Sequence, residues 1–245
     1  MLKITWTEKL RHFSPLIALG IFIIFIFTHL FFNKNYQFPD GISLLSLGKP
    51  FEISAFLFFF LIGIFLLIAT HTYIPKIYDS LTLMNPHQAK KLKIIKNINM
   101  VLAYLGIIGM VLQSAFNLNV PFSKDSFFKF LTFDKLKPIT MIIIHHILAF
   151  GAILVIGVSN ILLTSQIGLH RNILDTHSII YKKILSILFG IFLFLTFGLP
   201  MILRRNILIQ FMSPFFHQIS FIILCILFYG GFVYDYDNLY LSASI

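Results

Sequence analysis

Apolar residues in this chain are gathered into six long stretches separated by short polar segments. The stretches are 13–32, 51–74, 98–116, 139–163, 184–203 and 207–233. An α-helix needs roughly 20 apolar residues to cross the hydrocarbon core of a bilayer, and each stretch is close to or above that length. Short connections make successive helices antiparallel neighbours. The pattern therefore predicts an all-α integral membrane bundle of six transmembrane helices, with residues 1–245 forming one domain.

Composition supports a membrane protein and excludes other classes. Hydrophobic residues make up 58% of the chain and charged residues 11%, whereas charged residues make up about 25% of an ordinary soluble domain. The net charge of +10 lies mainly between the apolar stretches, where Lys and Arg normally flank membrane helices, so it does not indicate nucleic-acid binding. Cys225 is the single cysteine, which excludes a disulfide framework or a Cys-rich metal site.

The distribution of Lys and Arg predicts the orientation of the bundle. With six spans both termini lie on one side, and 11 of the 19 Lys and Arg residues share that side. They are Lys3, Lys9, Arg11, Lys76, Lys90, Lys91, Lys93, Lys96, Arg171, Lys182 and Lys183. We expect an integral protein of a bacterial inner membrane. Because positive residues favour the cytoplasmic side, we expect both termini in the cytoplasm.

Two of the cytoplasmic segments have similar sequences. Asn85–Pro86 is a helix cap and first turn followed by a lysine cluster, and Asp175 stands in the same way before Lys182 and Lys183. This repetition predicts that 51–116 and 139–203 are two copies of one helical hairpin.

Five of the nine histidines lie inside or at the edge of the apolar stretches. They are His29, His71, His145, His146 and His217. An ionisable side chain at membrane depth is costly and often marks a functional site. Imidazole can be buried in its neutral form and is the commonest protein ligand for metals and haem iron. In the predicted orientation His71 lies toward the cytoplasm, and the other four lie in the outer half of the bilayer.

Other polar residues gather at the same outer level. Gln210, Ser213, His217 and Ser220 follow helical spacing on one face, and Gly106, Gly109, Gln113 and Asn117 do so on another. Glycines allow helices to approach closely, and polar side chains in hydrocarbon seek partners in the bundle interior. His146 and Asn160 also share a face. We therefore expect a polar pocket between 13–32, 98–116, 139–163 and 207–233.

Each of these residues also has a purely structural interpretation. His29 and His71 are close enough to an interface to be ordinary snorkelling residues. His146 and His217 could each form an interhelical hydrogen bond, and Gln113 and Asn117 could hold helices together in the same way.

Haem b is the cofactor that these positions fit best. His217 with His145 or His146 would supply two imidazoles at one depth, and Arg204 or Arg205 would bind a haem propionate. The chain would then transfer electrons, as a membrane oxidoreductase or cytochrome b subunit, with a membrane quinone or a periplasmic redox protein. A second haem at His71 would take a ligand from a loop, for which His177 is the nearest candidate.

Two alternatives use the same region. Copper could be bound by His146 and His217 with the thioethers of Met141 and Met212. A small-solute transporter could be lined by histidine, glutamine and asparagine side chains. Apart from Glu52 at the start of the second stretch, however, no stretch contains Asp or Glu, and a proton-coupled transporter usually has a membrane carboxylate.

Three short segments resemble a known family. They are Leu10-Arg11-His12-Phe13-Ser14-Pro15-Leu16, Ser46-Leu47-Gly48-Lys49-Pro50 and Tyr73-Ile74-Pro75. Roughly residues 10–80 are thereby similar to the copper-resistance D membrane family, which implies copper passage or handling across the inner membrane. The chain is also similar to six-span b-type cytochromes in span number and histidine placement.

Overall fold

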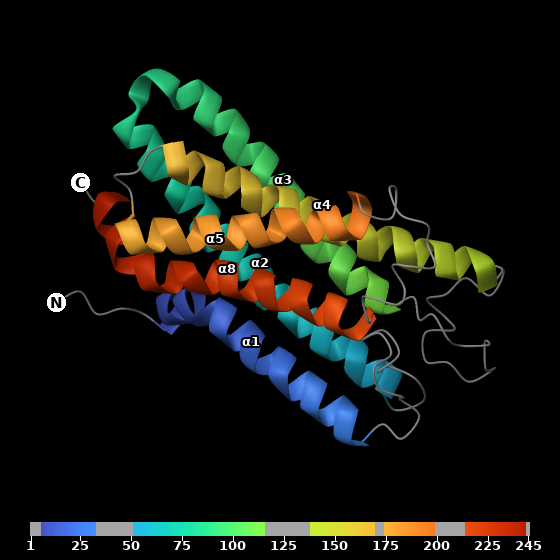
Figure 1. Cartoon of the computed structure of the whole chain (residues 1–245). Coiled ribbons are helices and arrows are strands. Elements are labelled where there is room, and N and C mark those ends of the chain that lie inside the picture. Colours follow the sequence, from blue (N-terminus) through green and yellow to red (C-terminus); the bar gives the residue numbers. More distant parts are fainter. Residues whose placement is uncertain (1–5, 33–50, 116–137, 170–173, 199–213, 244–245) are drawn as a thin grey trace.

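The chain folds into a bundle of long α-helices (Figure 1). The computed structural model describes residues 6–32, 51–115, 138–169, 174–198 and 214–243. The helices are α1 (Trp6–Phe32), α2 (Phe51–Met84), α3 (Ala89–Ala115), α4 (Pro138–Leu169), α5 (Thr176–Leu193) and α8 (Pro214–Ala243). A 3-10 turn, η2 (Pro86–Gln88), joins α2 to α3, and a π-helical turn, η4 (Phe194–Gly198), extends α5. The all-α prediction is confirmed for the described residues.

Within the described residues, five helical segments are long and apolar enough to cross a membrane. They are Trp6–Phe32, Ile53–Met84, Pro86–Ser114, Ile143–Leu169 and Thr176–Thr196, and α8 contains a shorter apolar segment, Ile219–Asp235. Large apolar side chains such as Phe27, Leu105 and Ile147 are exposed on the outside of the bundle, as lipid-facing residues would be. The helices thus have transmembrane character, while a sixth span remains a prediction.

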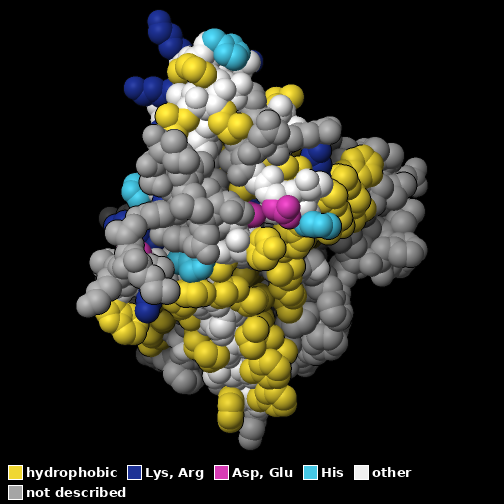
Figure 2. All heavy atoms as spheres, turned by 90° about the vertical axis from the view of Figure 1, so that its left-hand side faces the viewer, with side chains coloured by type: hydrophobic (Ala, Val, Ile, Leu, Met, Phe, Trp, Pro, Cys, Tyr) yellow, Lys and Arg dark blue, Asp and Glu magenta, His cyan; other side chains and the backbone are white. Residues whose placement is uncertain are grey.

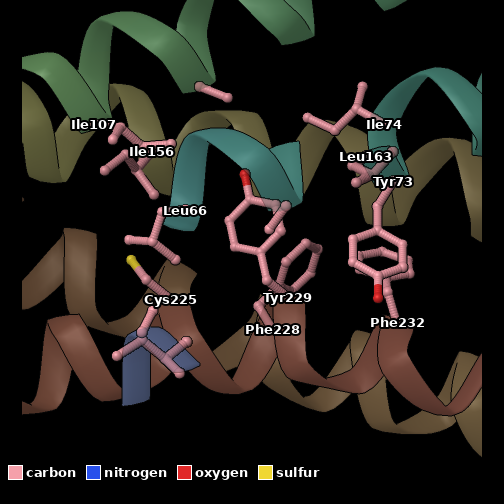
Figure 3. Close-up of a cluster of buried hydrophobic side chains, with 14 of the residues drawn as sticks. Leu66, Tyr73, Ile74, Ile107, Ile156, Leu163, Cys225, Phe228, Tyr229 and Phe232 are labelled. Carbon is pink, nitrogen blue, oxygen red and sulfur yellow. The ribbon is translucent and has the colours of Figure 1, made fainter. Parts of the chain in front are cut away.

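Successive helices pack side by side, and α8 returns to close the bundle. Each helix from α1 to α5 contacts the next one along the chain, and α8 packs against α1, α2 and α5. The buried core in Figure 3 brings together Leu66 and Tyr73 of α2, Ile156 of α4, and Cys225 and Phe228 of α8. The centre of the molecule therefore lies between α2, α4 and α8.

At one end of the bundle the described helices extend beyond their apolar stretches. At this end α1 starts at Trp6, α2 ends at Met84, α5 starts at Thr176 and α8 ends at Ala243. A helix satisfies its own backbone hydrogen bonds, so it can continue after its apolar residues end. Figure 2 looks onto this end, where Lys and Arg side chains project from the surface.

The two predicted helix caps have different outcomes. Asp175 caps α5, because its side chain accepts a hydrogen bond from the His177 backbone N–H at 3.1 Å. Pro86 occupies the first turn of η2 as predicted. The Asn85 side chain, however, accepts no hydrogen bond from the backbone N–H groups of η2. Asn85 Nδ2 instead donates to Leu81 O at 3.2 Å, so this side chain closes the end of α2.

Glycines set the distance between α3 and α4. A Cβ atom added at Gly106 would overlap Ile156 Cγ1 and would lie 2.9 Å from Val155 Cγ2. At Gly109 it would lie 3.4 Å from Leu148 O. The close helix approach expected from these glycines is confirmed.

Gly106→Ala should therefore destabilise the protein by about 1–3 kcal/mol, because the added methyl overlaps the α4 side chains. Gly151→Ala is the matched control, since a Cβ there meets nothing within 4 Å; removing a helical glycine should raise stability by up to about 1 kcal/mol. Thermal unfolding in detergent measures both. Equal stability of the two variants would contradict the close α3–α4 packing.

Candidate functional site

His29 is buried between α1 and α2, and both of its ring nitrogens are hydrogen-bonded. Nδ1–H donates to Phe25 O at 2.9 Å, and Nε2 accepts from Ser54 Oγ at 2.9 Å in the neutral ring. The ring also packs against Phe25 and Phe58. A metal ion at either nitrogen would replace one of these bonds. The geometry therefore favours a structural role, through burial rather than snorkelling.

His145 and His146 point in different directions from α4. His145 is buried, and its Nδ1–H donates to Gln113 O of α3 at 3.0 Å. His146 is exposed and stacks on Phe150, with ring centroids 5.9 Å apart. His145 thus forms a hydrogen bond between α4 and α3, and His146 faces the outside of the bundle.

This arrangement gives little support to a haem held between α4 and α8. α4 packs mainly against α3 and α5 and only slightly against α8, and the hydrogen bond of His145 goes to α3. The side chains of His217 and Met141 lie outside the described residues, as do Asn117, Arg204, Arg205, Gln210 and Met212. Within the described ranges, no three His, Cys, Asp or Glu side chains form a group suited to a metal ion.

His71 is exposed on α2 and hydrogen-bonded to the neighbouring helix. Its Nδ1 shares a hydrogen bond of 2.9 Å with the Tyr104 hydroxyl of α3. His177, its predicted partner for a second haem, is exposed in the first turn of α5. The contact observed for His71 is therefore an interhelical hydrogen bond, and the second haem stays a prediction.

A buried ion pair joins α5 to α8. Lys182 Nζ contacts Asp235 Oδ2, and neither side chain has any exposed surface. Ser178 Oγ donates to the same carboxylate oxygen at 2.6 Å, and Lys182 Nζ lies 2.6 Å from Ser178 Oγ. We call Ser178, Lys182 and Asp235 the ion-pair cluster. A carboxylate inside the bundle corrects the expectation, drawn from the apolar stretches, that acidic residues are absent there.

The remaining contacts of Lys182 come from one turn of α8. Gly231 O accepts a hydrogen bond from Nζ at 3.4 Å, and the ammonium lies 4.3 Å from the centroid of the Phe232 ring. Cation–π attraction of this kind is stronger when the groups are desolvated. Gly231 allows α5 and α8 to approach closely at this point, because a Cβ atom there would lie 2.6 Å from the Tyr181 ring of α5.

Asp235 has two carboxylate oxygens in different surroundings. Oδ2 receives the bonds from Lys182 and Ser178. Oδ1 is buried and has no hydrogen-bond partner among the residues that the structure describes. An unsatisfied oxygen on a buried charge is costly, so the cluster is an incompletely satisfied polar site inside an apolar bundle.

Four further polar residues, on α2, α4 and α8, are buried. We call Thr70, Asn160, Thr164 and Tyr229 the central polar layer. Thr70 Oγ1 donates to the Tyr229 hydroxyl at 3.2 Å. In the described part of the chain, no partner is found for Asn160 Oδ1, Asn160 Nδ2 or Thr164 Oγ1, although all three atoms are buried.

A third polar contact, between α2, α3 and α4, is satisfied. Ser159 Oγ donates to Asn99 Oδ1, and Asn99 Nδ2 donates to the Tyr78 hydroxyl at 3.3 Å. All three residues are buried. Interhelical hydrogen bonds of this kind hold membrane helices together, so we assign this contact a structural role.

Apart from Asn160, the residues of the ion-pair cluster and the central polar layer were given no functional role by the sequence. Lys182 and Asp235 fall just outside the apolar stretches 184–203 and 207–233, and Thr164 directly follows 139–163. A detectable signal was present: the buried face of α5 runs Ser178, Lys182, Leu185 and Phe189 at helical spacing. Such spacing places the lysine on the core side.

No protein family, curated protein or solved structure matches this chain. The function must therefore be argued from the side chains themselves, and the resemblance to the copper-resistance D family stays a prediction.

Proposed function

We propose that this protein transports a small polar solute across the membrane together with protons, and that Asp235 is the protonation site. The observation that carries the proposal is the ion pair of Lys182 and Asp235, which is fully buried in a bundle of apolar helices. Ionisable residues inside membrane bundles pair with one another and mark ion and proton pathways. With both termini in the cytoplasm, the cluster lies toward the cytoplasmic side.

The chemistry of Asp235 suits proton coupling. A proton can add to Oδ1 without displacing the bonds that Lys182 and Ser178 make to Oδ2. Protonation removes the negative charge that attracts the Lys182 ammonium. Since Lys182 belongs to α5 and Asp235 to α8, proton binding weakens the attraction between two helices. Loosening this contact provides a way to couple protonation to helix movement.

A purely structural role explains the pair less well. Buried ion pairs lose much of their attraction to the cost of desolvating both charges, and apolar residues of similar volume are often at least as stabilising. Phe232, which lies against the ammonium, stacks on Tyr73 with ring centroids 5.4 Å apart. These apolar surroundings would accept a pair such as Met and Leu, so the presence of two charges favours a function.

Electron transfer through haem b is the second candidate, and His145 is the observation in its favour. Histidines that ligate metals usually donate their other ring N–H to a carbonyl or carboxylate. His145 donates Nδ1–H to Gln113 O in this way, which puts the ring lone pair on Nε2.

Proteoliposomes loaded with a pH-sensitive dye test the transport proposal. Adding solutes one at a time, from polyols and amides to amino acids, should change the internal pH for at least one of them. Asp235→Asn should remove the response, since the amide cannot take up the proton. Asp79→Asn is the matched control, because Asp79 pairs with Lys96 at 2.9 Å on the exposed part of α2.

An absorption spectrum of the same purified protein decides between the candidates. Transport without haem predicts colourless protein, whereas a Soret band that shifts on dithionite reduction, with no pH response to any solute, would overturn the proposal in favour of haem. Colourless protein with stoichiometric copper and no pH response would instead support copper handling.

A further inference from the structure

We propose that the central polar layer is the solute-binding site and that its ligand is an uncharged molecule such as a small polyol or amide. The inference rests on the proposed transport function and names the substrate class. It starts from Asn160 and Thr164, which lie one turn apart on α4 and are 0% and 5% exposed. Three of their polar atoms have no partner among the described residues.

The neighbouring residue shows that the bundle can satisfy buried polar groups. Ser159 is next to Asn160, is equally buried, and is hydrogen-bonded to Asn99. A buried polar group without a partner is costly, and such groups are rare unless they have a function or bind an additional molecule. The contrast between Ser159 and Asn160 therefore points to a ligand for Asn160.

The position of Asn160 is central in the bundle. Ile156 and Leu163 lie about one turn before and after it on α4, and Figure 3 shows them on either side of Tyr229 along the bundle. The α4 segment between Ile156 and Leu163, to which Asn160 belongs, therefore runs past Tyr229 and its hydroxyl oxygen in this view. That oxygen accepts a hydrogen bond from Thr70, so its own proton remains for donation to a ligand.

The layer lies close to the proton site without being part of it. Gly168, one turn beyond Thr164, faces the α5 residue next to Lys182: its Cβ would lie 3.3 Å from Lys183 Cε. Going inward from the cytoplasmic end, the ion-pair cluster comes first and the polar layer follows. A solute in the layer would thus lie beyond the contact that protonation loosens.

The functional groups of the layer determine the ligand class. An Asn side chain offers two N–H donors and one acceptor, and a Thr hydroxyl offers one donor and an acceptor. A bare cation would use Asn160 Oδ1 but leave Nδ2–H unsatisfied, and an anion would do the reverse. The four residues of the layer are uncharged, and Lys182 is neutralised by Asp235. An uncharged molecule that both donates and accepts hydrogen bonds fits best.

Cysteine labelling tests this site while the transported solute is still unidentified. Cys225 is the single cysteine and is buried, so Cys225→Ala gives a cysteine-free background. Thr164→Cys in this background should react with aminoethyl methanethiosulfonate at least about tenfold faster than Leu163→Cys, because thiolates form readily in a hydrated site and poorly in an apolar one. Leu163 is fully buried in apolar surroundings and is the matched control. Asn160→Cys serves as a second reporter if Thr164→Cys does not elute as a folded protein.

Protection of the new cysteine identifies the ligand class. Glycerol or acetamide should slow labelling at least about twofold, whereas equal concentrations of glycine or sodium chloride should leave it unchanged. The inference would be overturned if the reporter cysteines reacted as slowly as Leu163→Cys, or if only glycine or salt slowed their labelling. If only amino acids changed the internal pH of the proteoliposomes, the transport function would stand but this binding site for uncharged solutes would be rejected. If the reporter cysteine is labelled and glycerol protects it, but no solute changes the internal pH, the binding site would stand and proton coupling would be rejected.

Discussion

Asp235→Leu alone should lower the free energy of unfolding by about 3–5 kcal/mol, because it leaves the Lys182 ammonium buried without its counter-charge. The remaining contacts of Lys182, to Ser178 Oγ and Gly231 O, are neutral. Solute-driven pH changes in proteoliposomes should be lost together with stability. Chemical or thermal unfolding in detergent measures the first effect, and the dye assay measures the second.

The double variant Lys182→Met/Asp235→Leu separates the two effects. Replacing a buried ion pair by apolar residues of similar volume is often neutral or stabilising, so the double variant should recover most of the lost stability while the pH response stays absent. Asp79→Asn, which removes an exposed carboxylate, should cost no more than about 1 kcal/mol and leave transport unchanged. If the double variant transported normally, the ion pair would be structural and the proposed function wrong.

The sequence predicted the helices well because membrane spans are set by apolar length. Each described helix contains or overlaps one of the six apolar stretches, but most are longer at the end where α1 starts and α8 ends. Apolar length marks where a helix meets hydrocarbon, not where its hydrogen bonds stop. Lys182 and Asp235 lie in these extensions. Because the spans were defined by their apolar residues alone, both residues fell outside the predicted spans and were not considered as site residues.

The histidines show a second limit of sequence analysis. Position along a helix predicts depth in the bilayer, but the rotation of the helix about its axis depends on its neighbours. His145 and His146 are adjacent, yet one reaches Gln113 of α3 and the other faces outward. Asn160 shares a face with His146 by helical spacing, yet Asn160 is fully buried and His146 is exposed. Packing partners, which the sequence does not specify, decide which polar residues meet.

Asn160→Leu should make the protein more stable and at the same time inactive. Leu fills a similar volume and removes two buried polar atoms that have no partner among the described residues. Leaving such a group unsatisfied costs about 1–3 kcal/mol, so removing it should raise the free energy of unfolding by a comparable amount. Loss of the solute-driven pH response should accompany this gain, because the amide is proposed to bind the solute. Unfolding in detergent and the proteoliposome assay measure the two effects.

Ser159→Ala is the matched control and should behave in the opposite way. It removes the hydroxyl that donates to Asn99 and leaves that buried amide oxygen without this donor, so stability should fall by about 1–3 kcal/mol. Transport by the remaining folded protein should persist, since Ser159 belongs to the structural contact with Asn99 and not to the central polar layer. A loss of stability in Asn160→Leu would mean that the amide is satisfied in the folded bundle, and the solute would then have to bind elsewhere.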